Sequence, residues 1–157
     1  MFCSREELPD ILQKVFLNNK PSPCSQSEIL SLEHHFHISL PTTYKVILRS
    51  MGHGAENFWE GEDCFYRHLP QIQKLAKKLL KENNFPLPLP SDAFVFFMHQ
   101  GYQFSFFKLS EGDNPPVYSY LEDQEYPDFR KTHEKLSDFL ATEIDLYDKY
   151  ATRFLAA

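Results

Sequence analysis

Three histidines close together, His34, His35 and His37, are the residues of this chain that most resemble a metal-binding cluster. A helix would place His34 and His37 on one face, because they are three residues apart. Metal sites on helices usually need a further carboxylate or thiolate and hydrogen bonds that orient the ligands. The chain has no H-E-x-x-H or C-x-x-C spacing, and its cysteines are odd in number: Cys3, Cys24 and Cys64. We therefore interpret the histidines as structural or solvated, and we expect reduced thiols and no metal.

The motifs of covalent catalysis and of phosphate binding are absent. The sequence contains no G-x-S-x-G, no G-x-G-x-x-G and no G-x-x-x-x-G-K-[ST]. Gly52-His53-Gly54 follows a predicted helix, whereas a phosphate-binding loop precedes one. Cys64 could meet a histidine in space, but a lone cysteine beside Phe65 is more often a packing residue. We expect no catalytic residue, no cofactor and no enzyme activity.

Acidic residues gather in two short stretches. Lys and Arg total 16 against 22 Asp and Glu, which gives a net charge of −6, and residues 111–157 carry the whole surplus. An acidic loop can be merely solvated, or it can face a partner. We predict the second. Direct binding of nucleic acid or of an anionic membrane is disfavoured, because the net negative charge of the chain repels both. The predicted partner-binding residues are Glu60, Glu62, Asp63, Glu122, Asp123, Glu125 and Asp128.

The N-terminal residues and the apolar runs suggest a compartment. Residues 1–7 are acidic and have no apolar core of a secretory signal. The longest wholly apolar run is 93–98, far below the roughly 20 residues that a membrane span needs. We expect a soluble, cytoplasmic protein.

Helical spacing of apolar residues predicts most of the elements that would carry these groups. A chain of 157 residues is long enough for one domain with a full core. Ser25 and Glu28 have the spacing of a capping box, so a helix should start there. Gly52 stands where a left-handed helix end would be. The predicted helices cover 6–19, from 25 to about 36, from Leu40-Pro41 to 51, 68–83 and 132–150.

Strands are expected mainly between the last two helices. Residues 93–98 are apolar on both faces, and Tyr102, Phe104 and Phe106 alternate with polar residues as in a half-buried strand. These two should form a hairpin around Gly101, with a third strand at 117–121. One or two further strands are expected within 57–66. The order indicates an α+β fold, a mainly antiparallel sheet flanked by N-terminal and C-terminal helices.

Three stretches in this order resemble the SUKH superfamily, in its Smi/Knr-like branch. The first runs from Ser27-Glu28-Ile29 through Leu40-Pro41-Thr42-Thr43-Tyr44-Lys45 to Met51-Gly52. The second is Trp59. The third runs from Leu89-Pro90 through the 93–104 region to Pro115-Pro116-Val117-Tyr118. The chain departs from the pattern in Gly52-His53-Gly54 and in a longer helix within 61–83.

The resemblance implies a single SUKH-like domain over 1–157, with a family core at 25–145 after an N-terminal helix and linker at 1–24. It also implies a non-catalytic protein-binding role. Many bacterial members are immunity proteins that neutralise toxins, often nucleases, and fungal relatives regulate cell-wall synthesis through protein contacts. The expected partner is a protein, such as a cognate toxin. A regulatory scaffold with several partners and an enzyme without a known motif remain alternatives.

Overall fold

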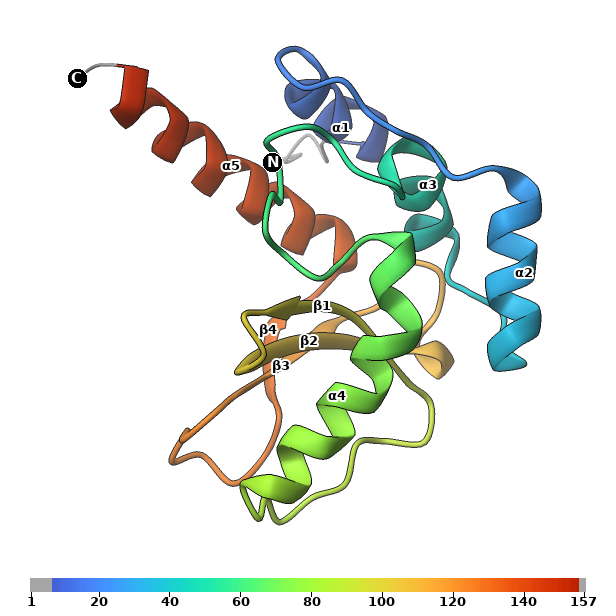
Figure 1. Cartoon of the computed structure of the whole chain (residues 1–157), viewed down its shortest axis with the longest axis vertical. Coiled ribbons are helices and arrows are strands. Elements are labelled where there is room, and N and C mark those ends of the chain that lie inside the picture. The colour runs from blue at the N-terminus through green and yellow to red at the C-terminus, as the bar shows by residue number, and fades with distance from the viewer. Residues whose placement is uncertain (1–6, 156–157) are drawn as a thin grey trace, which may run out of the picture.

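The computed structural model describes residues 7–155, with side chains described for 7–151 (Figure 1). Cys3, the N-terminal residues 1–6 and the predicted start of the first helix lie outside this range. The elements in chain order are α1 (Leu8–Phe16), α2 (Gln26–Phe36), α3 (Thr42–Met51), η1 (Tyr66–His68), α4 (Leu69–Glu82), β1 (Ala93–His99), β2 (Gln103–Lys108), η2 (Leu109–Glu111), β3 (Val117–Leu121), β4 (Arg130–His133) and α5 (Leu136–Leu155). The predicted α+β class is confirmed, because N-terminal and C-terminal helices flank the sheet.

The strands form one antiparallel sheet in the order β1-β2-β3-β4. The predicted hairpin around Gly101 and the third strand at 117–121 are confirmed. A fourth strand, β4, occupies residues that we expected in a loop and at the start of the last helix, so that helix begins at Leu136 instead. No apolar pattern predicts strand β4, because three of its four residues are exposed.

The edge of the sheet at β1 is closed by groups outside the sheet. The Val95 N–H donates to Gln73 Oε1 at 2.9 Å, and Gln73 Nε2 donates to the Val95 carbonyl at 2.6 Å. Further along, Asp63 and Met98 exchange two backbone hydrogen bonds of 3.0 Å. The edge strand thereby satisfies backbone groups that would otherwise stay unpaired.

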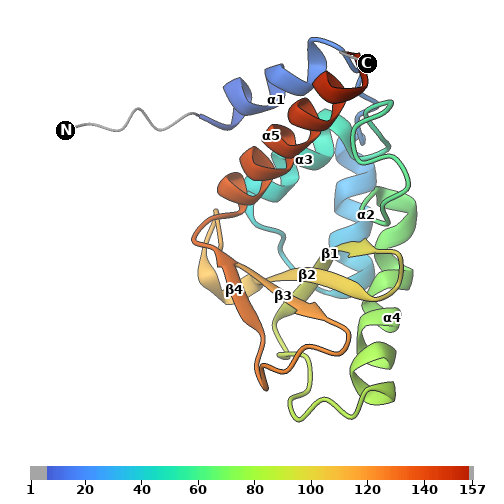
Figure 2. The same cartoon turned by 90° about the vertical axis from the view of Figure 1, so that its left-hand side faces the viewer.

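Both faces of the sheet are covered. On one face, Phe94, Phe96 and Phe107 surround Tyr44 of α3, and Phe96 also meets the ring of Phe139 of α5. The opposite face carries Phe104 and Phe106 and packs rings from β3 and from the segments at residues 85 and 129. Figure 2 shows α1, α3 and α5 gathered above the sheet, with α4 along its side. The prediction that β2 is half-buried is therefore wrong, because residues 104–107 are buried on both faces.

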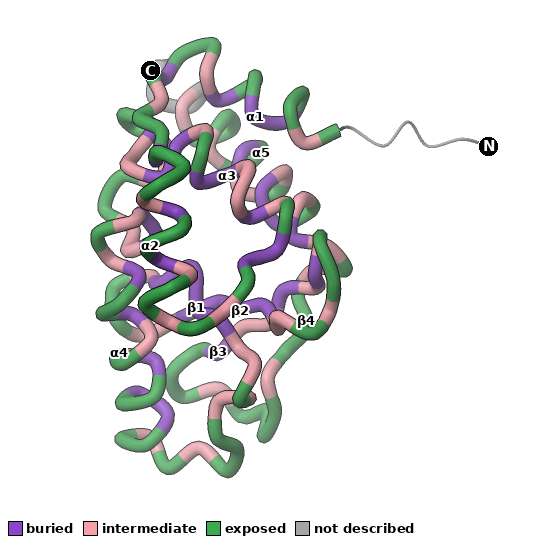
Figure 3. The backbone as a smooth tube through the Cα atoms, turned by 90° about the vertical axis from the view of Figure 1, so that its right-hand side faces the viewer, coloured by how far each residue is buried: buried purple, intermediate pink, exposed green. Residues whose placement is uncertain are grey.

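The tube in Figure 3 shows buried positions recurring along one side of α4 and along the sheet. The apolar stripe of α4 is buried at Ile72, Ala76, Leu79 and Leu80, and Leu75 on the same side is partly buried. The hydroxyl of Tyr44 is the one buried side-chain polar atom without a hydrogen-bond partner among the described residues. Burial raises the pKa of this hydroxyl well above its usual value.

The helix ends follow the local signals in one case and not in another. The capping box is confirmed, since Ser25 accepts from the Glu28 N–H while Glu28 accepts from the Ser25 N–H. The predicted left-handed end at Gly52 is wrong, because Gly52 has φ −61° and ψ −23°. A Cβ there would lie 2.2 Å from Cys24 Sγ and 2.6 Å from the Leu48 carbonyl oxygen. Glycine is required at this position by close packing, not by backbone conformation.

Regular strands do not form within residues 57–66, contrary to the prediction. The segment makes only isolated bridges, Ala55 with Phe58 and Asp63 with Met98. Glu56, Trp59 and Gly61 have positive φ values of 47°, 58° and 82°, which turn the chain repeatedly and prevent an extended strand. The aromatic residues of this segment, such as Phe58 and Trp59, therefore lie in a loop and not in a strand.

Candidate functional site

The loop of residues 57–63, hereafter the 57–63 segment, holds three of the predicted partner-binding residues beside the β1 edge. Its backbone is anchored at Asp63, which pairs with Met98. Glu60 is exposed, whereas Glu62 and Asp63 are partly buried. The segment separates two hollows, one of about 530 Å³ and one of about 580 Å³, and Glu60 and Glu62 line both of them. These carboxylates therefore form a ridge between two concave surfaces.

Glu62 and Asp63 each meet a histidine. The two carboxylate oxygens of Glu62 lie 2.7 and 2.8 Å from His99 Nδ1, and the Glu62 side chain is only 18% exposed. Asp63 Oδ1 lies 3.5 Å from His68 Nε2. Burial lowers the pKa of His68, while Asp63 opposes this effect. Glu62 is thus a positioned acid with a basic neighbour, and Glu60 is the more accessible carboxylate of the three.

The second predicted acidic stretch is a loop of residues 121–128, hereafter the acidic loop. Its shape is fixed by one side chain, because Gln124 accepts from the Leu121 N–H and donates to the carbonyls of Tyr126 and Asp128. The acids on this loop are all exposed: Glu122, Asp123, Glu125 and Asp128. A polar residue in the middle of the loop therefore orders it while its carboxylates face solvent.

The two acidic stretches lie at the same end of the sheet. In Figure 2 the turn between β1 and β2 lies between the 57–63 segment above it and the acidic loop below it. The Glu122 N–H donates to the Tyr102 carbonyl, and the Tyr102 ring meets the His99 ring edge-on at 5.4 Å. Strands β1 and β3 are separated by β2, so their backbones lie about 10 Å apart there. The structure thus brings the seven predicted residues to one end; that they contact a partner stays a prediction.

The sequence analysis missed residues of α5 that face the 57–63 segment. Trp59 Nε1 donates to Glu143 Oε2 at 3.2 Å, and Trp59 stacks on Phe58 with ring centroids 4.7 Å apart. Tyr147 meets the Phe58 ring edge-on and donates its hydroxyl hydrogen to Asn19 Oδ1. These residues line the larger hollow, between residues 57–62 and α5, which we call the Trp59 groove.

Asn19, a buried polar residue, joins the two sides of the groove by hydrogen bonds. Its Oδ1 accepts from the Asn57 N–H and from the Tyr147 hydroxyl, and its Nδ2 donates to the Val15 carbonyl. Asn19 thus links the end of α1 to both walls of the groove. The sequence predicts only an N-terminal helix and a linker for residues 1–24, with no residue of a site. A signal for the groove did exist, since Glu143, Tyr147 and Tyr150 recur at helical spacing.

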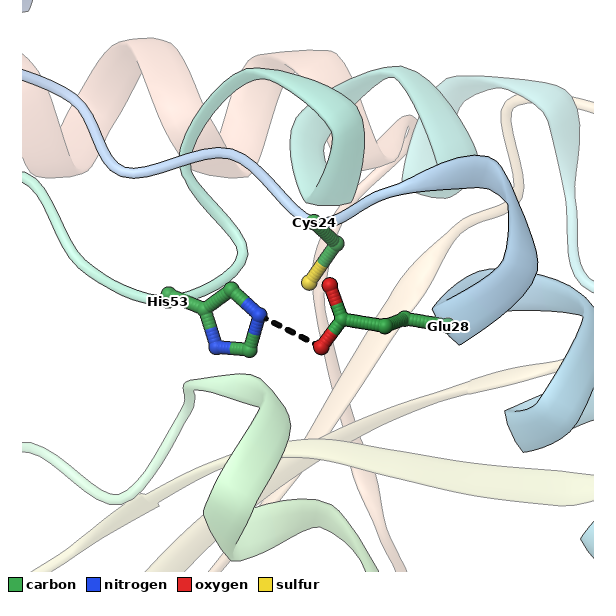
Figure 4. Close-up of side chains that lie close together, drawn as sticks. All are labelled: Cys24, Glu28 and His53. Atoms are coloured by element: carbon green, nitrogen blue, oxygen red, sulfur yellow. Dashed lines mark hydrogen bonds and ion pairs between the residues drawn. The ribbon is translucent and has the colours of Figure 1, made fainter.

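Cys24, Glu28 and His53 form the one cluster of possible metal ligands among the described residues (Figure 4). Their ligand atoms lie within 4.8 Å of one another. His53 Nε2 lies 2.7 Å from Glu28 Oε2, and the Ser25 N–H donates to Glu28 Oε1. The Ser25 backbone hydrogen bond and, secondarily, His53 lower the pKa of Glu28. Histidine and capping box therefore already satisfy this carboxylate without a metal.

The same cluster does not present an activated thiol. Burial, with help from Glu28, raises the pKa of Cys24 to about 12, so the thiol stays protonated at neutral pH. Cys64 is also buried, and burial raises its pKa well above the usual value. His34, His35 and His37 are exposed, as expected for solvated histidines. Our prediction of a metal-free protein stays a prediction, and this cluster is where it should be tested.

A comparison with models of protein families gives a match. A family model described as SMI1-KNR4 cell-wall, of the SUKH group, matches residues 26–140, which include α2 through the first turns of α5. No curated protein matches the chain. Within residues 7–155, no helix has both the length and the apolar character required to cross a membrane.

Proposed function

From the chain's membership of the SMI1-KNR4 cell-wall family, to which it belongs over residues 26–140, we propose that it is a non-catalytic protein-binding domain. Its specific role in this proposal is that of an immunity protein, which binds a bacterial toxin and neutralises it. The observation that carries the proposal is the acidic end of the sheet. Seven carboxylates from residues 57–63 and 119–128 gather there, and neither stretch contains a lysine or an arginine.

Charge complementarity supports a toxin that acts on nucleic acid as the partner. Such a toxin must present a basic cleft to the phosphate backbone. An acidic surface attracts this cleft over a distance and blocks it on contact. A stable complex would need to bury about 800 Å² on each partner, so in this proposal the acidic loop, the β1–β2 turn and the 57–63 segment contact the toxin together.

The experiment neutralises the acidic loop without disturbing its backbone. In the triple variant Glu122→Gln, Asp123→Asn and Glu125→Gln, asparagine keeps the positive φ of 63° at position 123 accessible. The partner used is the product of a neighbouring toxin-like gene, with affinity measured by calorimetry at low and high salt. We expect at least a tenfold loss of affinity, a smaller salt dependence and an unchanged melting temperature.

A matched control separates a local effect from a change in overall charge. Gln13→Lys, Ser31→Lys and Gln71→Lys raise the net charge by the same three units at exposed positions of α1, α2 and α4. This control should bind the toxin as the parent does. Equal losses in both triple variants, or no loss in either, would refute the acidic end as the interface.

A second candidate function is a regulatory scaffold in cell-wall synthesis. The description of the matching family favours it. A survival assay distinguishes the two roles: an immunity protein restores growth to cells that express the toxin, and the acidic-loop variant fails to do so. A regulator would give no protection and would bind several unrelated proteins.

A further inference from the structure

The Trp59 groove combines aromatic walls with carboxylates, and no lysine or arginine lines it among the residues that the structure describes. Phe58 and Trp59 form its floor, and Tyr147 stands against Phe58. Leu146 and Tyr150, which are 56% and 63% exposed, extend the apolar surface along α5. Exposed large side chains of this kind in one patch are typical of a binding surface.

Glu143 is the carboxylate at the back of this groove. At its Oε2 the Glu143 carboxylate accepts a hydrogen bond from the Trp59 indole N–H. Burial raises the pKa of Glu143, and Glu62 adds to this effect, whereas the Trp59 hydrogen bond and His99 oppose it. His99 is itself engaged by Glu62 at 2.7 Å. A positive charge that entered the groove would therefore be attracted by Glu143 and by the exposed Glu60.

We propose that the Trp59 groove binds an arginine side chain of the protein partner; this inference rests on the proposed function. A guanidinium group is planar, stacks on aromatic rings and donates two parallel hydrogen bonds to a carboxylate. The groove offers both features side by side, since Trp59 and Glu143 are in direct contact. A lysine ammonium is more strongly hydrated and cannot stack, so it fits the same groove less well.

Trp59 gives this proposal a direct readout, because it is the only tryptophan of the chain. Its indole N–H gives a single resonance in a nitrogen–proton correlation spectrum. The probe is N-acetyl-arginine methylamide, titrated into the full chain, with the lysine and citrulline analogues as matched probes. We expect a saturable shift of the indole resonance with arginine, at least threefold weaker binding of lysine, and no saturable shift with uncharged citrulline.

Two variants test the carboxylates. Glu143→Gln removes the charge and keeps an oxygen that accepts from Trp59, and it should weaken arginine binding at least tenfold. Glu60→Gln should weaken it less, and Glu82→Gln, at an exposed position of α4 outside the groove, should leave it unchanged. The dispersion of the spectrum reports whether each variant is folded. If Glu143→Gln does not fold, Glu60→Gln still tests the arginine site.

The results separate this inference from the proposed function. Equal binding of citrulline and arginine, or unchanged arginine binding in both Glu143→Gln and Glu60→Gln, would overturn the arginine site. Toxin binding through the acidic loop could still hold in that case. Conversely, arginine binding in the groove together with no effect of the acidic-loop variant would refute the proposed interface and retain the groove.

Discussion

The aromatic centre of the sheet and the Trp59 groove use similar side chains under different constraints. Around β1 and β2 the rings are buried and the edge backbone groups are paired, for example Val95 with Gln73. In the groove, Trp59 has a positive φ of 58°, and Glu143 keeps a carboxylate where burial opposes its charge. Local features that cost stability are concentrated at functional sites. The contrast therefore separates residues that hold the fold from residues available for binding.

The largest expected effect is on the sheet centre. Phe96 is 3% exposed and touches the rings of Tyr44, Phe107 and Phe139. Phe96→Ala should lower the free energy of unfolding by about 3–5 kcal/mol, because a cavity is left among rigid neighbours. Urea unfolding measures this. The control Tyr126→Ala removes a ring that is 51% exposed and should change stability by less than about 0.5 kcal/mol. A similar urea midpoint for both variants would contradict the assignment of Phe96 to the core.

A smaller loss is expected at the sheet edge. Gln73→Ala removes both hydrogen bonds to Val95 and should cost about 1–3 kcal/mol, since partly buried backbone groups lose their partners. Gln71→Ala is the control, because Gln71 is exposed on the same helix. Hydrogen exchange should become faster at the Val95 amide in the first variant alone. Unchanged exchange there would mean that Gln73 does not close the edge.

In the groove we expect a substitution that raises the stability of the protein. When the pKa of a carboxyl is higher in the folded chain than in the unfolded chain, the free energy of unfolding falls as the pH rises through the folded pKa. Glu143→Gln removes this ionisation and should raise the melting temperature at neutral pH. The advantage should vanish below the ordinary glutamate pKa of about 4.3, where Glu143 is protonated in both states. Thermal melts across pH 3–8, with exposed Glu60→Gln as control, test it; a lower melting temperature at pH 7 would contradict the sign.

The smallest expected effect is at the Cys24, Glu28 and His53 cluster. We predict that the purified protein carries no stoichiometric zinc and that EDTA leaves its melting temperature unchanged. The physical reason is that His53 and the capping box already engage Glu28, while the thiol of Cys24 stays protonated. Elemental analysis of the parent and of His53→Ala checks this. One zinc per chain that is lost in His53→Ala would overturn the prediction.

The elements predictable from sequence are those whose buried residues form a simple local pattern. The apolar stripe of α4 recurs at helical spacing, the run 93–98 is continuously apolar, and both elements were located correctly. Strand β4 has no buried residue, so no hydrophobic alternation marks it. The packing role of Gly52 depends on Cys24, whose Sγ would lie 2.2 Å from a Cβ at position 52, and no local pattern encodes this proximity.

The site was predictable to a similar degree. The acidic stretches are visible because their charges are consecutive in the chain. The groove depends on Trp59 meeting Glu143, 84 residues later, and one helix face must be placed in space before this contact can be seen. Helical spacing places Glu143, Tyr147 and Tyr150 on one face of α5, but it does not show that this face meets the 57–63 segment.

The closed edge at β1 restricts how any partner can attach. A peptide that extends a sheet needs a row of unpaired N–H and C=O groups. At β1, Gln73 and the Asp63 backbone already occupy such groups on Val95 and Met98. Strand addition at this edge would first have to break those bonds. Recognition next to β1 must therefore be read from side chains, and its specificity is open to change by single substitutions that leave the sheet intact.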